Sequence, residues 1–184
     1  MSTLVSPAIS TWNIDASHSN VEFAVRHMMV ATAKGRFSEI VGTVEYDGSN
    51  FAGAQIQVEI PIASIDTRQE QRDAHLRSPD FFDAENHPIA TFVSKRISGN
   101  PSGEFQIVGD LTIRGITKEV VLQAESHGAV RDPWGMDRAG FSASTKINRN
   151  DFGLTWNATL ETGGFVVAPE VKLTLDIEIT KPGS

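Results

Sequence analysis

Histidines are the side chains best suited to proton transfer or metal binding near neutral pH. The chain has five of them, His18, His27, His75, His87 and His127. Their spacing contains no HExxH pattern, which would place two metal ligands and a base on one helix face, and the sequence has no GxSxG elbow, GxGxxG motif or phosphate-binding loop. The absence of cysteine excludes thiolate nucleophiles and Cys-ligated metals. We therefore predict no catalytic residue, no metal site and no cofactor.

The nearest approach to a catalytic cluster is Arg72, Asp73 and His75, which lie in a predicted helix. Asp73 and His75 are two residues apart and so do not share a helix face. We favour a structural role, in which these side chains bind neighbouring loops. The alternative is an enzyme acting on a hydrophobic substrate, with His75, Asp73 or His27 as acid or base. A metal held by His75, His87 and Asp73 is a third, less favoured arrangement, because His87 precedes a proline in a predicted loop.

Arg149 lies between Asn148 and Asn150 in what the sequence indicates is a polar turn between strands. Turn formation is the favoured interpretation of this segment. Alternatively, Arg149 lies at a pocket mouth and faces an anionic head group.

Alternation of apolar and polar residues predicts strands with one buried face. The clearest row is Val171, Leu173, Leu175, Ile177 and Ile179. Similar segments lie at residues 21–25, 55–60, 89–97, 105–114, 120–124, 139–147 and 154–160. About eight or nine strands with short links favour an antiparallel sheet, and closure into a barrel would remove its exposed edges. We expect Leu173→Ala to cost about 2–5 kcal/mol, as for a buried leucine.

One predicted strand changes phase, because Phe37 belongs to one face and Ile40 and Val44 belong to the other. An extra residue near Ser38 or Glu39 would explain this change, so we predict a β-bulge there.

A short helical insert interrupts the strand pattern. Thr67 and Glu70 fit a capping box, which predicts a helix of two or three turns ending near Arg77. Ser78 and Pro79 then resemble a second helix start, with a further turn over residues 80–82. This turn carries Phe81 and Phe82, which we expect to plug one end of the barrel as core, with ligand gating as the alternative.

The 184 residues suit a single domain, which we place at residues 12–180 after a flexible N-terminus of residues 1–11. Residues 181–184 are also expected to fray. The formal net charge of -7 makes nucleic acid an unfavourable partner, and no apolar run reaches the length of a membrane helix. The first ten residues lack a signal-peptide pattern, so we expect a cytoplasmic protein, or a periplasmic one if a cleaved leader preceded this sequence.

Four segments occur together in an order that resembles the YceI-like family. They are TWNIDASHSNVEFAVRHMMVATAKGRF, SIDTRQEQRDAHLRSPDFFDAENHPIATFVS, GDLTIRGITKEVVL and GFSASTKINRNDFGL. The resemblance covers residues 12–180 and implies an all-β, antiparallel eight-stranded, lipocalin-like barrel with a short helical insert. It also implies an apolar interior for a polyisoprenoid chain, as in isoprenoid quinones or prenyl diphosphates, and often a dimer. Many members of this family are periplasmic.

We therefore predict non-catalytic binding, carriage or transport, or storage of a long isoprenoid lipid inside the barrel. The predicted lining is Phe23, Val25, Phe37, Val58, Phe81, Phe82, Phe92, Leu111, Phe141, Phe152 and Trp156. Small inward residues, Gly42, Gly109 and Ala143, would leave space for the ligand. His27, Arg26 and Arg149 are the candidates for a polar head group, and the charge of -7 favours a neutral quinone. Ordinary core packing of the same residues, in a dry structural barrel with a partner-binding surface, is the competing interpretation.

Overall fold

The computed structural model describes residues 8–183, which form one sheet of eleven strands. The strands are β1 (Ser10–Ile14), β2 (Asn20–His27), β3 (Ala31–Phe37), β4 (Val41–Tyr46), β5 (Gln55–Pro61), β6 (Ile65–Asp66), β7 (Ile89–Gly99), β8 (Glu104–Ile113), β9 (Ile116–Arg131), β10 (Met136–Asn148) and β11 (Val167–Pro182). The helices are α1 (Glu70–Arg77) and the short 3-10 helices η1 (Ala16–His18), η2 (Phe51–Gly53), η3 (Ile62–Ser64) and η4 (Arg149–Phe152). None of the helices described is long and apolar enough to span a membrane.

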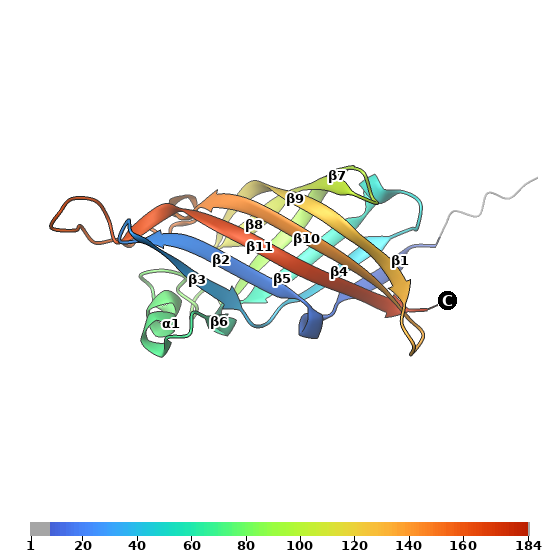
Figure 1. Ribbon diagram of the computed structural model, residues 1–184, viewed down its shortest axis with the longest axis horizontal. Coiled ribbons are helices and arrows are strands. Elements are labelled where there is room, and N and C mark those ends of the chain that lie inside the picture. The colour runs from blue at the N-terminus through green and yellow to red at the C-terminus, as the bar shows by residue number, and fades with distance from the viewer. Residues whose placement is uncertain (1–7, 184) are drawn as a thin grey trace, which may run out of the picture.

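The sheet closes on itself through β11. One edge of β11 pairs with β10, and its other edge pairs with β2 near the beginning of the strand and with β1 near its end. The ring runs β1, β4, β5, β7, β8, β9, β10 and β11, with antiparallel pairing throughout (Figure 1). The predicted antiparallel eight-stranded barrel is therefore confirmed.

The predicted change of phase lies where the strand breaks between β3 and β4. β3 ends at Phe37, β4 begins at Val41, and Ile40 between them is buried. The Ser38 N–H donates to the Ser64 carbonyl over 3.0 Å instead of continuing the ladder. The position of the irregularity is confirmed, but it is a three-residue break rather than a single-residue bulge.

The strand predicted at residues 154–160 is wrong. This segment carries only an isolated bridge between Thr159 and Phe165. The carbonyls of Leu154 and Trp156 accept hydrogen bonds from the Arg149 guanidinium. They therefore pair with a side chain instead of with a neighbouring strand.

The predicted frayed ends, residues 1–11 and 181–184, include residues that the structure places in strands. Ser10 pairs with Tyr46 in β1, and β11 continues to Pro182, opposite Met136. The Gly183 N–H then donates to the Gly135 carbonyl over 2.9 Å. Residues 1–7 and 184 lie outside the described residues.

Helix α1 is confirmed, but its predicted capping box is wrong. The N-cap is Gln69, which makes no side-chain cap bond. The Asp73 carboxylate instead accepts the Thr67 N–H at 2.9 Å and the Thr67 hydroxyl, while Arg72 Nε donates to that hydroxyl at 2.8 Å. Arg72 and Asp73 thus have the favoured structural role, because both bind Thr67 in the segment that precedes the helix. After the helix, Phe81 N–H donates to the Ser78 carbonyl at 3.0 Å, so the second segment makes a turn but no helix.

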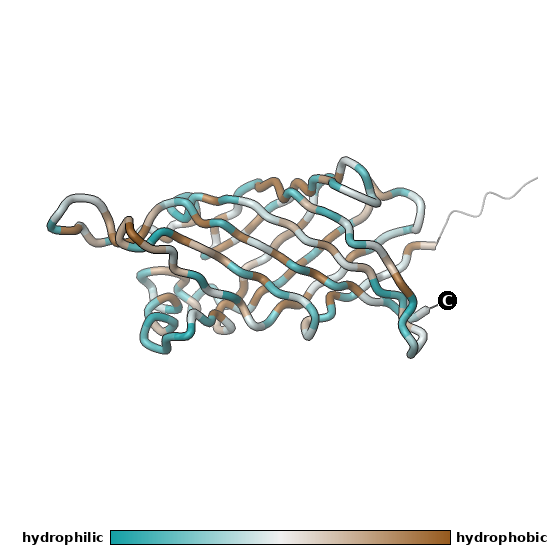
Figure 2. The backbone as a smooth tube through the Cα atoms, viewed as in Figure 1, coloured by the Kyte–Doolittle hydropathy of each residue, from teal (hydrophilic) through white to brown (hydrophobic). Residues whose placement is uncertain are grey.

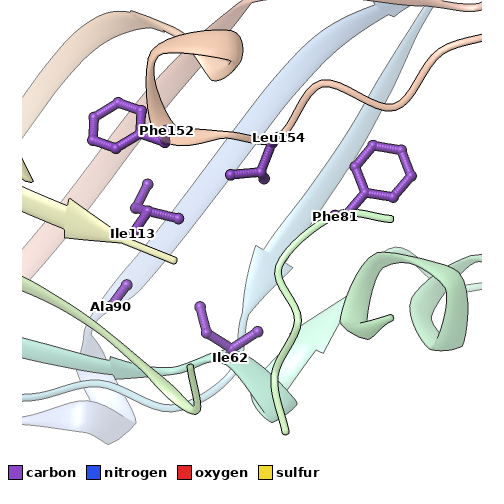
Figure 3. Close-up of a cluster of buried hydrophobic side chains, with 6 residues drawn as sticks. All are labelled: Ile62, Phe81, Ala90, Ile113, Phe152 and Leu154. Atoms are coloured by element: carbon purple, nitrogen blue, oxygen red, sulfur yellow. The ribbon is translucent and has the colours of Figure 1, made fainter. Parts of the chain in front are cut away.

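Two clusters of buried side chains form the core. The α1-end cluster consists of Ile62, Phe81, Ala90, Ile113, Phe152 and Leu154 (Figure 3). The far-end cluster consists of Phe92, Ile97, Phe105, Ile107, Leu122 and Ala124. The far-end cluster comes from β7, β8 and β9 alone, and the alternation of hydropathy along these and the other strands is visible in Figure 2.

An ionic network joins the ends of the closing strands. Arg138 of β10 donates to Asp15 at 3.0 Å, to Glu178 of β11 at 2.6 Å and to Asp132 at 2.6 Å. Hydrogen bonds from Ser17 and His18, followed by the one from Arg138, hold the pKa of the Asp15 carboxyl well below its usual range. Because Asp15 also donates its N–H to the Glu178 carbonyl, this network lies directly at the seam between β1 and β11.

Asp15→Asn is expected to flatten the acid side of the stability profile. An unfolded aspartate titrates near pH ~3.9 and the folded Asp15 titrates lower, so its stabilisation is complete above the unfolded pKa and is lost as pH falls toward the folded pKa. The stability lost at pH 7 in the Asp15→Asn variant should be about 1 kcal/mol, because water screens the network. Urea unfolding from pH 7 down to about pH 2 measures this. Equal acid dependence in both proteins would contradict the assignment.

Candidate functional site

The inner wall of the barrel is the candidate site, and strand register defines which side chains form it. Leu173 of β11 lies opposite Phe23 of β2 and Thr145 of β10, and Val171 lies opposite Val25. On the other side, Val58, Phe92 and Leu111 are neighbours across β5, β7 and β8. The predicted strand residues of the lining therefore share one face of the closed sheet.

This inner wall is only partly buried along β11. Its inward row, Val171, Leu173, Leu175 and Ile177, retains accessible surface and belongs to neither cluster. Phe23 and Val25 of the adjacent β2 are likewise partly exposed and outside both clusters. Inside a closed barrel, apolar side chains keep accessible surface only where the interior is incompletely packed. The inward residues of β11 and β2 are therefore less tightly packed than those of the two clusters.

Aromatic side chains gather at the α1 end of the barrel. Phe37 contacts Phe23 at 5.8 Å and Phe82 at 6.0 Å between ring centroids. Trp156 contacts Phe81 at 5.4 Å and His75 at 4.8 Å. We call this group of six rings, Phe23, Phe37, His75, Phe81, Phe82 and Trp156, the aromatic cover. Five of its members were predicted site residues, and the structure brings them together.

The other predicted aromatic and aliphatic residues lie around the far-end cluster. Phe92 belongs to that cluster, and Val58, Leu111 and Phe141 pack against it. Sequence reasoning missed Phe105, which contacts Phe141 at 6.0 Å, and Phe51, which contacts Phe105 at 5.0 Å. The predicted lining also contained no residue of β11, although the alternation of apolar and polar residues is clearest in that strand.

Three predicted features do not line an open space. Phe152 is only 2% exposed, in the α1-end cluster, and offers a ligand almost no surface. Gly42 and Gly109 do not leave room either. A Cβ on Gly109 would lie 2.5 Å from the Phe92 ring, and one on Gly42 would lie 2.6 Å from the Ile14 side chain. The space beside these glycines is therefore filled by neighbouring side chains.

Arg149 is buried among backbone carbonyls. Its guanidinium donates to Ala168 at 2.9 Å, to Val167 at 3.0 Å, to Trp156 at 2.9 Å and to Leu154 at 2.5 Å. Burial lowers the pKa of Arg149. These bonds use four of the five N–H groups of the guanidinium. Contact of Arg149 with a head group stays a prediction, and it would depend on the fifth N–H group.

The other head-group candidates lie at the end of β2. Both Arg26 and His27 are exposed. Arg26 donates to the Met29 carbonyl over 3.2 Å. Contact of either side chain with a head group stays a prediction.

The proposed acid–base residues have separate partners. Asp73 binds Thr67, whereas His75 Nε2 lies 2.9 Å from Asp80 Oδ2. Among residues 8–183, the one group with metal-ligand spacing is Asp15, His18 and Glu178 rather than His75, His87 and Asp73. Arg138 already donates to both carboxylates of that group, which gives them a cation partner.

Two grooves lie on the outer face of the barrel, with volumes of about 710 and 610 Å³. Both include Lys172 and Thr174, which alternate with the inward Leu173 and Leu175. Most of the residues that line the two grooves are polar, so the grooves differ in chemistry from the apolar inner wall.

Comparison with known proteins relates the whole chain to one family. The YceI-like domain model matches residues 12–179. A UPF0312 protein of Staphylococcus epidermidis is 37% identical over 173 residues, which cover 94% of this chain and 98% of that protein. The crystal structure of the Campylobacter jejuni YCEI protein is 30% identical, with a TM-score of 0.72 over 85% of this chain and 89% of that one. A polyisoprenoid binding domain from Saccharophagus degradans, 16% identical, shares the fold with a TM-score of 0.66 over 93% of this chain and 98% of that one.

The two leucines Leu173 and Leu122 provide a test of the inner wall. Leu122 is buried in the far-end cluster, so Leu122→Ala should cost about 2–5 kcal/mol. Leu173 is partly exposed and outside both clusters, so the sequence-based expectation of a similar cost is revised to about 1 kcal/mol for Leu173→Ala. Urea unfolding of the ligand-free proteins measures both. Equal losses would mean that the interior around Leu173 is fully packed.

Proposed function

Because the chain belongs to the YceI-like family, we propose that it is a non-catalytic protein that binds and carries a long isoprenoid lipid inside the barrel. The observation that carries this proposal is the inward, partly exposed apolar row of β11 and β2. An eight-stranded barrel is wide enough to be filled by its side chains or to hold one slender ligand. Here the inward row of β11 stays partly exposed and belongs to neither cluster, which favours a ligand.

The chemistry of this wall suits a hydrocarbon tail. Val171, Leu173, Leu175 and Ile177 lie opposite inward apolar residues of β10 or β2 at most positions, and they offer no charged group. Burial of each methylene-sized unit of a tail contributes up to about 0.8 kcal/mol. Because ordering a flexible chain costs entropy, the measured affinity will be far below that sum. Binding of this kind selects for length and slenderness rather than for a particular polar group.

The aromatic cover supports a ligand that lies lengthwise in the barrel. The cover occupies the α1 end, while Phe51, Phe105 and Phe141 form a second aromatic group toward the far end. A long tail could extend between these two groups along β11. The Saccharophagus degradans domain, described as binding polyisoprenoids, shares this fold and gives a reason to choose an isoprenoid as the first probe.

The head group that we propose is neutral, as in an isoprenoid quinone. The chain carries a net charge of -7, and the buried Arg149 gives most of its donors to backbone carbonyls. A diphosphate would need several cations close together. A quinone needs at most one or two hydrogen-bond donors, such as His27 or the remaining N–H of Arg149.

A substitution pair on β11 tests the proposal. Leu175 points inward and Thr174 points outward, so Leu175→Trp should block the interior and Thr174→Trp should not. Binding of a long-chain isoprenoid quinone is measured by tryptophan fluorescence or by retention on gel filtration. We expect binding by the unmodified protein and by Thr174→Trp, and a loss of about tenfold or more in Leu175→Trp.

The quinone ring without its tail is the matched control ligand, and it should not bind. A mass spectrum of lipid extracted from protein purified from its native host should show an isoprenoid. The proposal is wrong if the unmodified protein takes up no quinone, or if both tryptophan variants bind equally well. Conversion of the quinone that is lost in His75→Ala would instead favour an enzyme.

A further inference from the structure

An exposed apolar tip extends from the α1 end of the barrel. It consists of Met28, Met29 and Val30 in the turn between β2 and β3, together with Phe165 in the loop that precedes β11. Val30 is 83% exposed and Phe165 is 59% exposed. The two loops are tied together, because Met28 N–H donates to the Val166 carbonyl over 2.7 Å. Figure 1 shows both loops at the same end of the molecule, and Figure 2 shows hydrophobic stretches in them.

The turn between β2 and β3 is an unfavourable place for methionine. The Val30 N–H donates to the His27 carbonyl over 3.2 Å, and the two central residues, Met28 and Met29, have φ angles of 51° and 64°. A two-residue turn with positive φ at both positions favours Asn-Gly, since side chains are strained there. Neither the turn nor core burial therefore explains the two methionines. Strained, exposed apolar residues of this kind occur at functional sites.

The charge beside the tip has the opposite sign to that of the whole chain. Residues 23–35 contain Arg26 and Lys34 and no acidic residue, although the net charge of the protein is -7. The Arg26 guanidinium donates to the Met29 carbonyl over 3.2 Å and is thereby held at the turn. Glu161 is the single charged residue in 157–166. An apolar point with cations behind it is complementary to the anionic surface and apolar interior of a lipid bilayer.

We propose that this tip is a membrane-docking element, which inserts Met28, Met29, Val30 and Phe165 into the interfacial layer of a bilayer while Arg26 and Lys34 face anionic head groups. This inference rests on the proposed function in one respect, because it names the source from which an isoprenoid lipid would be loaded. The loop that carries Phe165 also carries Trp156 of the aromatic cover. Docking would thus bring the covered end of the barrel against the membrane.

The opposite end provides an internal control. Trp134 lies in the turn between β9 and β10 and is 82% exposed. The register places this turn beside the end of β11 and the tip beside its beginning, about 50 Å apart along an extended strand. Trp134 is flanked by Asp132 and Asp137, and each of these is paired with an arginine, Arg138 and Arg131 respectively. The charge beside Trp134 is therefore balanced, whereas the charge beside the tip is positive.

The test is flotation of the intact protein with vesicles of phosphatidylcholine, with and without phosphatidylglycerol. We expect binding that is stronger with phosphatidylglycerol and weaker at high salt. The double variant Met28→Asn/Met29→Gly places the favoured residues in the turn, so it should keep or raise the thermal stability and lower vesicle binding about tenfold or more. Trp134→Ser should bind as the unmodified protein does. Val30→Thr/Phe165→Ser, which leaves the turn residues unchanged, should also lose binding.

Three results would overturn the docking proposal: no vesicle binding by the unmodified protein, unchanged binding by both tip variants, or a tip-dependent dimer in light scattering, which would identify a second copy as the partner. Loading of isoprenoid quinone from ethanol separates this proposal from the proposed function. Tip variants should load normally from ethanol and slowly from vesicles. If the unmodified protein docks but takes up no quinone from either source, the docking proposal stands and the proposed function fails.

Discussion

The closure of one sheet along β11 is the constraint on which the rest of the structure depends. A closed sheet has no free edge and its circumference is set by the number and tilt of its strands, so the inner side chains must fill a cylinder of fixed width. The far-end cluster fills the side formed by β7, β8 and β9. The inward row of β11 is partly exposed and does not belong to this cluster. The partial exposure of this row is therefore a consequence of the closure combined with the side chains that β11 and β2 present.

Side chains from other elements hold β11 near both of its ends. Near its beginning, the Arg149 guanidinium donates to the carbonyls of Val167 and Ala168. Near its end, Glu178 receives a hydrogen bond from Arg138. Backbone ladders with β10 and β2 hold its middle, where the inward apolar side chains belong to neither cluster. A strand fixed in this way keeps its position whether or not a ligand lies against it, which is what a preorganised binding wall requires.

The strands could be predicted from the sequence because their signal is local. Alternation alone assigns an inner face to Leu173 and Phe141, and the loss of phase after Phe37 locates the strand break. The errors arise where a distant group competes for a backbone bond. Arg149 takes the carbonyls of Leu154 and Trp156, so no strand forms there, and Asp73 takes the Thr67 N–H that the capping box required. Similarly, the sequence cannot tell that Phe92 fills the space beside Gly109, because the two residues lie on different strands.

The break between β3 and β4 also determines how the α1 end is covered. β3 pairs with β6 at only two positions, Arg36 with Asp66 and Phe37 with Ile65, so the ladder stops there and residues 67–88 take its place. The cover over this end is consequently made of side-chain contacts between separate elements, with Phe37 from β3, Phe82 from the segment after α1 and Trp156 from the loop before β11. Such contacts can separate without breaking a strand ladder, whereas access through the wall would require the loss of several backbone hydrogen bonds. The α1 end, which carries the exposed apolar tip, is thus less costly to open than the wall.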